Sequence, residues 1–253
     1  MTGFGVLLRK ELLESWRTLR LPVVVLLFLT FGILSPLTAR YLQDIIDAVA
    51  PQRFGIRLPP PTLTDAVDQL LKNTAQTGAL VAILITMGSV ATEKERGTAA
   101  FVLVKPVSRL AFLAAKLTVL AALLGISIGL AVGAAWIYTT ILFGAPDVGG
   151  WLVLAMLVWL STLAYASLTF VGSTVFRSSL AGAAVGFAGL IAIALASAVP
   201  EFSHYLPPGL TAVARTAAVG GGLIDIVRPL VATVAIITVC FVVAWRSFER
   251  QEL

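Results

Sequence analysis

Few side chains in this sequence are of a type that could carry out a reaction. His204 is the only histidine, and Ser173, in the stretch FVGSTVF, is the serine whose glycine neighbour best suits a nucleophile. They could support hydrolysis within a membrane only if the imidazole lay within hydrogen-bond reach of the hydroxyl. The chain also lacks the G-x-x-x-x-G-K-[ST] motif that cradles the phosphates of ATP. Catalysis therefore depends on whether the fold brings these two residues together.

A metal site is no better supported by the sequence. A pathway for a soft metal ion would be lined by Met, Cys and His side chains. The candidates are scattered along the chain and are Met87, Met156, Cys240 and His204. Since Cys240 is the only cysteine, an intrachain disulfide is excluded. The sequence predicts no metal site and no cofactor in this chain.

The most charged segment is 91–116, ATEKERGTAAFVLVKPVSRLAFLAAK, which lies between two long apolar stretches. It contains five basic and two acidic side chains. Thr98 could cap a short helix with Phe101 on its apolar side, and Ser108 could cap the helix that follows. Opposite charges beside apolar side chains suit a surface that docks another protein. A solvated turn would have the same composition, so the residues alone leave both interpretations open.

The composition indicates an integral membrane protein. Hydrophobic residues make up 58% of the 253 residues and charged residues 12%, about half of the roughly 25% that is typical of soluble domains. Six stretches free of charged side chains approach the roughly 17 to 20 residues that a helix needs to cross a bilayer. We therefore predict one all-α transmembrane domain over 1–253, with six spans at about 21–39, 73–92, 115–143, 151–176, 178–200 and 229–246.

The distribution of basic residues predicts the orientation. With the N-terminus inside the cell, the cytoplasmic segments hold twelve of the eighteen basic residues, as the positive-inside rule requires. Both termini are then cytoplasmic, in the cell (inner or plasma) membrane, and 91–116 is a cytoplasmic loop. Ser173 would lie near the inner face and His204 outside, so we expect no catalysis. The net charge of +5 comes from basic residues that mostly mark the inner ends of helices, so it does not predict nucleic acid binding.

Residues 4–20 are expected to form an amphipathic helix along the inner membrane surface. Its apolar face would carry Leu8, Leu12, Trp16 and Leu19, and its polar face Lys10, Glu14 and Arg17. Trp16 would lie at the level of the lipid headgroups, with the basic side chains toward anionic lipid. Pro22 would allow the chain to bend into the first span.

Two outer segments are also distinctive. In the first, LPPPTLTDAVDQLLK predicts a proline turn and then a helix capped by Thr62 or Thr64. The second, 201–228, is long but apolar, and it is typical of a segment that dips into the membrane edge and returns. Such backbone is tolerated only where it packs on protein or lines a cavity. We therefore expect an outer re-entrant gate at Tyr205, Pro207, Pro208 and Gly209.

The sequence resembles type-2 ABC transporter permeases in three places. EKERGTAAFVLVKPVSRLAFLAAK is similar to their segment between spans two and three, where E-K-E-R-G-T precedes a hydrophobic patch and K-P-V-S-R. LLRKELLESWR, with the pair Lys10 and Glu11, is similar to their N-terminal elbow helix. YLPPG is similar to their outer re-entrant segment. Together the three stretches and the six spans extend the resemblance over essentially the whole chain.

The resemblance implies a dimer of permeases coupled to two separate cytoplasmic ATPase subunits, which would bind ATP and magnesium. A cytoplasmic coupling helix would press on the ATPase. It would consist of Glu93, Lys94, Glu95, Arg96, Gly97 and Thr98, with Phe101 nearby. The first and fifth spans would line the dimer interface and the pathway, in agreement with the small residues Gly182 and Gly186 in the fifth span. The family includes exporters of drugs and peptides and permeases for copper-enzyme maturation, and this apolar chain suits hydrophobic or amphipathic cargo.

Two other functions remain open on the residues alone. A secondary carrier driven by ions usually needs ionisable groups at membrane depth, and the six charge-free stretches contain none. A membrane scaffold without transport would need no such groups. If the chain is a secondary carrier, the purified chain should transport its substrate under an ion gradient. If it is a scaffold, we expect neither transport nor coupling to an ATPase.

Overall fold

The computed structural model describes residues 3–49, 59–98, 107–223 and 225–251, and the regular structure within them is entirely helical. The helices are α1 (Phe4–Arg17), α2 (Arg20–Val49), α3 (Leu63–Thr86), α4 (Ala91–Glu95), α6 (Arg109–Phe143), α7 (Val148–Val175), α8 (Ser179–Ser197), α9 (Pro200–Ser203), α10 (Pro207–Ala218) and α11 (Val227–Glu249). Six segments are long and apolar enough to cross a membrane: α2, α3 with α4, α6, α7, α8 and α11. The predicted all-α membrane fold with six spans is confirmed.

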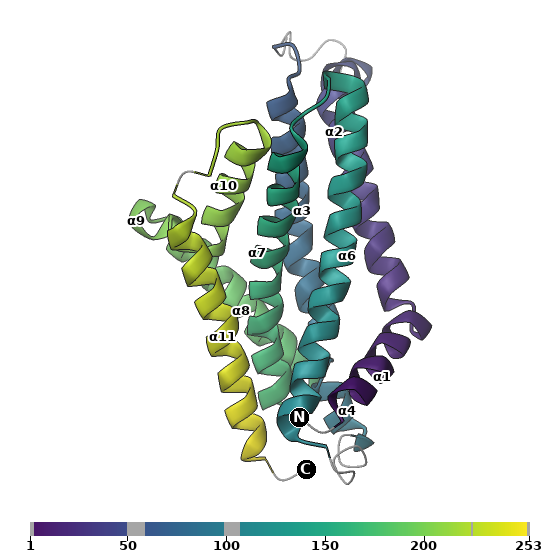
Figure 1. The fold of residues 1–253 in the computed structure, drawn as a ribbon, viewed down its shortest axis with the longest axis vertical. Coiled ribbons are helices and arrows are strands. Elements are labelled where there is room, and N and C mark those ends of the chain that lie inside the picture. Colours follow the sequence, from purple (N-terminus) through teal and green to yellow (C-terminus); the bar gives the residue numbers. More distant parts are fainter. Residues whose placement is uncertain (1–2, 50–58, 99–106, 224, 252–253) are drawn as a thin grey trace.

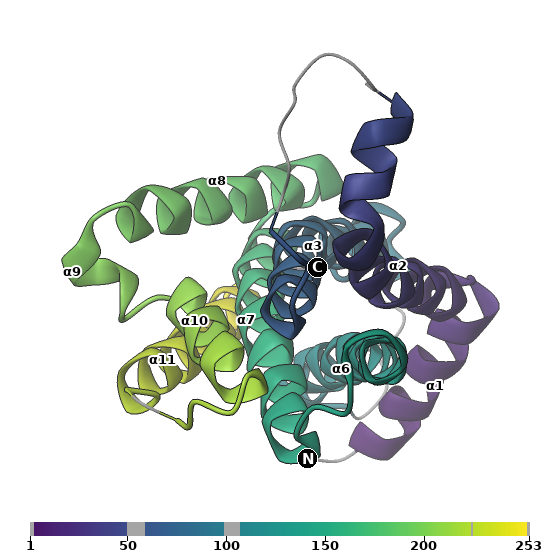
Figure 2. The same ribbon diagram turned by 90° about the horizontal axis from the view of Figure 1, so that it is seen from above.

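The long helices form an elongated bundle (Figure 1). Helix α7 is central and packs against α3, α6, α8, α10 and α11, while α2 packs mainly on α6 and α3 (Figure 2). The beginning of α1 and the end of α11 lie at one end of the bundle, at the bottom of Figure 1, which we call the terminal end. The opposite end, where α3 and α7 begin, is called the distal end.

Glycines allow the closest approaches between helices. A Cβ atom at Gly32 of α2 would overlap the carbonyl oxygen of Ala131 in α6. A Cβ atom at Gly150 of α7 would likewise overlap the carbonyl oxygen of Ala217 in α10. Small residues are the usual means of packing helices tightly in membranes, where water does not drive helices together.

Polar caps set where several helices begin. Thr62 donates its backbone N–H (2.8 Å) and its hydroxyl (2.7 Å) to Asp65 Oδ2, so α3 begins at Leu63 and continues into the membrane without a break. The predicted capped outer helix and the second span are therefore one helix. Ser108 Oγ accepts a hydrogen bond from the backbone N–H of Ala111 at 3.1 Å, which confirms the predicted cap of α6.

The bend between α1 and α2 lies before the predicted position. Leu19 has a φ of 58°, in the left-handed region that non-glycine residues rarely adopt. Pro22 belongs to the first turn of α2, where the fixed φ of proline is tolerated because the first N–H groups have no helical partner. The expectation of a bend at Pro22 is wrong, and the turn is made at Thr18 and Leu19.

The small residues of α8 pack within the chain. A Cβ atom at Gly182 would lie 2.7 Å from the carbonyl oxygen of Met87, and one at Gly186 would overlap Thr169 of α7. The glycines therefore join α8 to α7 and to the end of α3. Their presence does not support the expected dimer interface, because this face of α8 is already covered.

Candidate functional site

An ion cluster joins three helices at the terminal end, and we define it as Lys10, Glu11, Glu93 and Lys116. Glu93 Oε1 accepts hydrogen bonds from Lys10 Nζ at 2.7 Å and from Lys116 Nζ at 2.9 Å. Glu11 Oε1 accepts from Lys116 Nζ at 2.9 Å and from Lys10 Nζ at 3.1 Å. The cluster thus fastens α1 and α4 to the beginning of α6.

Three members of the ion cluster are largely removed from solvent, whereas the side chain of Lys10 is 40% exposed. The side chain of Lys116 is 3% exposed, and those of Glu11 and Glu93 are 13% exposed. Burying a charge costs several kcal/mol, which only close pairing and hydrogen bonds offset. Two ammonium groups and two carboxylates provide this pairing through Oε1 of each glutamate, while Glu93 Oε2 is buried without a hydrogen-bond partner among the described residues. Desolvation lowers the pKa of Lys10, but the hydrogen bond and the charge of Glu93, together with Glu11, outweigh it and raise that pKa above its usual value.

The carboxylates of this region are neutralised by lysines. One oxygen atom from each of Glu11, Glu14 and Glu93 lies within 4.8 Å of the others, a spacing that could suit a metal ion. Lys10 Nζ also lies 3.5 Å from Glu14 Oε2. Because the ammonium groups of Lys10 and Lys116 already supply the positive charge, we interpret the group as an ion-pair network.

Lys94 fastens the other side of α4. Its Nζ donates to the carbonyl oxygen of Thr174, near the end of α7, and to Gln251 Oε1 at 3.1 Å. Gln251 Nε2 in turn donates to the carbonyl oxygens of Thr174 at 3.1 Å and Val175 at 3.3 Å. The last described residue of the chain therefore helps to hold α4 against α7.

The beginning of α4 is capped by Ser173. Its Oγ accepts hydrogen bonds from the backbone N–H groups of Val90 and Ala91, each at 3.1 Å. His204 follows α9, at the far end of α8, and the 19 residues of α8 extend about 28 Å at 1.5 Å per residue. The separation predicted for Ser173 and His204 therefore agrees with their places in the fold, and Ser173 has a structural role.

Arg109 holds the end of α11 at the same site. Its guanidinium donates to the carbonyl oxygens of Phe248 at 2.7 Å, Glu249 at 2.9 Å and Gln251 at 2.9 Å. The carbonyl groups in the last turn of a helix lack the usual i+4 partner, and Arg109 supplies a donor to those of Phe248 and Glu249 and to that of Gln251, which follows the helix. The rings of Phe112 and Phe248 stack beside it with their centroids 5.6 Å apart.

The predicted coupling helix is divided between two environments. Glu93 and Lys94 turn inward and make the contacts just described, whereas Glu95, Arg96, Gly97 and Thr98 are exposed. We call residues 95–98 the exposed turn, in which Gly97 has a φ of 69°. The expectation that all six residues form a docking surface is corrected for Glu93 and Lys94, and Phe101 lies outside the described residues.

The amphipathic helix α1 faces the protein with polar side chains and with Leu7, which is buried in an apolar cluster. Lys10, Glu11 and Glu14 turn toward the ion cluster, whereas Trp16 is 63% exposed and Arg17 is also exposed. An exposed apolar face agrees with contact between α1 and lipid. The expectation that Lys10 points toward anionic headgroups is wrong, because that side chain pairs with Glu93.

The predicted outer gate residues lie at the beginning of α10. Pro207 is buried, and its carbonyl oxygen accepts a hydrogen bond from Ser161 of α7 at 3.0 Å. Pro208 and Gly209 line a cavity of about 460 Å³. Tyr205 is exposed instead, and its ring lies 5.8 Å from the guanidinium carbon of Arg228. Pro208 and Gly209 therefore line this cavity, whereas Pro207 is buried against α7 and Tyr205 does not line the cavity.

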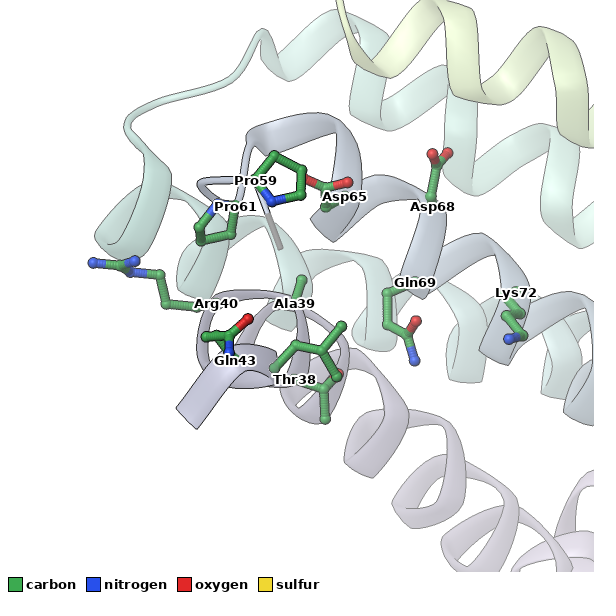
Figure 3. Close-up of a pocket in the computed structure, with 11 residues that line it drawn as sticks. Thr38, Ala39, Arg40, Gln43, Pro59, Pro61, Asp65, Asp68, Gln69 and Lys72 are labelled. Carbon is green, nitrogen blue, oxygen red and sulfur yellow. The ribbon is translucent and has the colours of Figure 1, made fainter. Parts of the chain in front are cut away.

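A second cavity, of about 320 Å³, lies between the distal parts of α2 and α3 (Figure 3). Charged side chains of both signs line it. Asp65 accepts the cap hydrogen bonds of Thr62, and Asp68 pairs with Arg215 of α10. Because its carboxylates already have partners within the chain, the cavity is not a ready site for a cation.

Sequence reasoning missed the partners of the coupling residues. In the sequence, Lys116 is the last charged residue before an apolar stretch. This position is the only sequence feature that indicates a buried side chain. Nothing in the sequence indicated that Ser173, Arg109 or Gln251 would meet α4 or α11, since these contacts join residues far apart in the chain.

Comparison with known proteins agrees with this architecture. Residues 6–253 match the family model described as ABC-2 family transporter protein. The chain is also 28% identical over 204 residues to the uncharacterized transmembrane protein YxlG of Bacillus subtilis (strain 168), and the match covers 79% of each chain. The fold, the six apolar helices and the extent of the family match agree, and the chain belongs to the ABC-2 family of transporter proteins.

Proposed function

We propose that this chain is the permease subunit of an ATP-driven exporter in which two identical permeases work with two separate ATPase subunits. The family match supports a membrane component that relies on another protein for ATP hydrolysis. The observation that carries the proposal is the exposed turn, which projects beside a rigid cluster of buried charges. ATP and magnesium would bind to the ATPase subunits.

The contacts of α4 support a coupling role. A force on the exposed turn would reach α1 and α6 through Glu93, and α7 and α11 through Lys94 and Gln251. Buried hydrogen-bonded charges resist small displacements, because separating them leaves an unpaired charge in a poorly solvated site. The exposed turn would therefore move together with several transmembrane helices.

The orientation belongs to the same proposal. The terminal end carries the exposed turn and most of the basic residues, which agrees with a cytoplasmic position. Both termini would then be cytoplasmic, and α1 would lie as an elbow helix on the inner surface of the cell membrane. The segment of α9 and α10 would be the outer re-entrant gate.

The pathway would lie between two permeases. Helices α2 and α8 flank one side of α3 (Figure 2) and expose apolar side chains such as Leu34 and Leu195. A second copy could cover these helices and enclose a pathway lined by apolar, small and hydroxyl side chains. Such a lining favours hydrophobic or amphipathic cargo, because it offers charged groups no compensation for lost hydration.

The test is co-purification of the tagged chain from its native membrane in mild detergent, followed by identification of the bound proteins. We expect a stoichiometric nucleotide-binding subunit. The double variant Glu95→Lys with Arg96→Glu should lose it while remaining folded in the membrane, since these side chains are exposed and lie outside the ion cluster.

The matched control is Glu201→Lys, which reverses an exposed charge on α9 and should leave the ATPase bound. A wild-type chain that purifies without an ATPase would contradict the proposed function. Transport by that chain alone under an ion gradient would then favour a secondary carrier, and the absence of transport would favour a scaffold. Retention of the ATPase by the double variant would refute only the docking role of the exposed turn.

A further inference from the structure

Helix α10 packs mainly on α7 and also contacts the distal part of α3. Leu210 and Val213 of α10 are buried in one apolar core with Val67 and Leu70 of α3. This core gives the two helices a shared surface, so a displacement of α3 would disturb the packing of α10.

A charged pair fixes α10 on that surface. The guanidinium of Arg215 donates to both carboxylate oxygens of Asp68, with the Nη2 to Oδ2 bond at 2.9 Å. Asp68 is also one of the residues that line the cavity between α2 and α3, as Figure 3 shows. Two parallel hydrogen bonds from one guanidinium define a direction as well as a distance.

The chain after α10 contains glycines that can accommodate a displacement of that helix. Gly220 and Gly222 have φ values of 84° and 77°, which glycine adopts without steric cost. Pro207 and Pro208 form the first turn of α10 and fix its beginning. The helix is therefore bounded by a rigid start and by a glycine segment that can absorb changes in backbone angle.

The opposite end of the same membrane crossing carries Glu93. Helices α3 and α4 follow one another through the turn at residues 87–90. The helical part from Asp68 to Thr86 alone extends about 27 Å at 1.5 Å per residue. Each end thus bears a carboxylate that pairs with another element: Asp68 with α10, and Glu93 with α1 and α6.

We propose that α3 and α4 form one rigid link, and that Asp68 and Arg215 are the positioning residues that make α10 follow the exposed turn. The inference rests on the proposed function for its meaning, because the exposed turn would receive the force of the ATPase. The mechanical link itself belongs to this chain and can be tested without any partner.

The experiment is amide hydrogen exchange of the purified chain in lipid nanodiscs, with α10 as the reporter. Asp68→Asn should speed exchange in α10 by about two- to fivefold, the range expected from losing an exposed ion pair. Glu93→Gln, at the other end of the link, should speed exchange in α10 by at least about twofold. In the double variant Asp68→Asn with Glu93→Gln, α10 should exchange at the same rate as in Asp68→Asn alone, because the first substitution already breaks the link to α10.

The controls keep the test specific. Lys72→Gln and Glu95→Gln change exposed charges on α3 and α4 that make no ion pair among the described residues, and they should leave α10 unchanged. Lys10→Gln perturbs the same cluster at a more exposed position and replaces Glu93→Gln if that variant does not fold. Multiplicative effects of the two substitutions, or faster exchange in α1 and α4 without any change in α10, would overturn the proposal. Neither outcome depends on whether an ATPase binds this chain.

Discussion

Individual residues show that the coupling segment is held from two chemically different sides. Glu93 is fixed by ion pairs with lysines of α1 and α6, whereas Lys94 is fixed by neutral oxygens of α7 and the C-terminal segment. The charged residue types were visible in the sequence. Their partners were not, because Glu93 and Lys10 are separated by 83 positions and Lys94 and Gln251 by 157.

The ion cluster should be sensitive to the loss of one member. Lys116→Met leaves Glu11 and Glu93 with Lys10 as their ammonium partner in the cluster, and removing one partner of a buried pair typically costs about 3 to 5 kcal/mol. We expect a clearly lowered midpoint in thermal unfolding followed by size-exclusion chromatography in detergent. An unchanged midpoint would contradict the assignment of a buried ion cluster.

Lys94 should tolerate the same substitution better. Its Nζ bonds neutral oxygens, so Lys94→Met removes a buried charge and leaves no carboxylate unpaired. The lost hydrogen bonds cost about 1 kcal/mol each, and the relief of desolvation offsets part of this cost. The thermal unfolding midpoint of Lys94→Met should therefore be well above that of Lys116→Met, and the reverse order of midpoints would contradict this account.

At the scale of elements, the sequence predicted the number and type of helices better than their limits. Apolar stretches located the six membrane-crossing segments, because the bilayer sets their length. The extension of α3 to Leu63 depended on its cap at Thr62, which the sequence signalled only as a helix start. The bend at Leu19 had no sequence signal, and the proline nearby pointed to the wrong residue.

The contact between α8 and its neighbours should not accept a side chain at Gly182. The Cβ atom of Gly182→Ala would lie 2.7 Å from a backbone oxygen, which cannot rotate away. Overpacking of this kind costs about 1 to 3 kcal/mol, so thermal stability in detergent should fall.

The matched control is Gly133→Ala in α6, where no atom lies within 4 Å of an added Cβ atom. Alanine is the better helix former, so this variant should be at least as stable as the original chain. Equal effects at Gly182 and Gly133 would show that the contact of α8 with Met87 is not tight.

For the whole molecule, the proposed dimer can be tested by cross-linking. Single cysteines at Leu34 of α2, Leu195 of α8 and Val239 of α11, all exposed, should be introduced together with Cys240→Ala. Pairing through α2 and α8 predicts disulfide-linked dimers in native membranes from at least one of the first two positions. Dimers formed only through Val239 would contradict the proposed interface, and gel electrophoresis without reductant distinguishes these results.

The sequence by itself determined the membrane class, the six helical spans and the position of the charged segment between the second and third spans. These properties follow from hydrophobic length, charge composition and local capping, which act over short distances along the chain. The tertiary structure alone decided which charged residues are buried, because pairing between α1, α4 and α6 depends on how the helices pack. It also decided that the glycines of α8 face the same chain, since periodicity defines a helix face but not the surface that covers it.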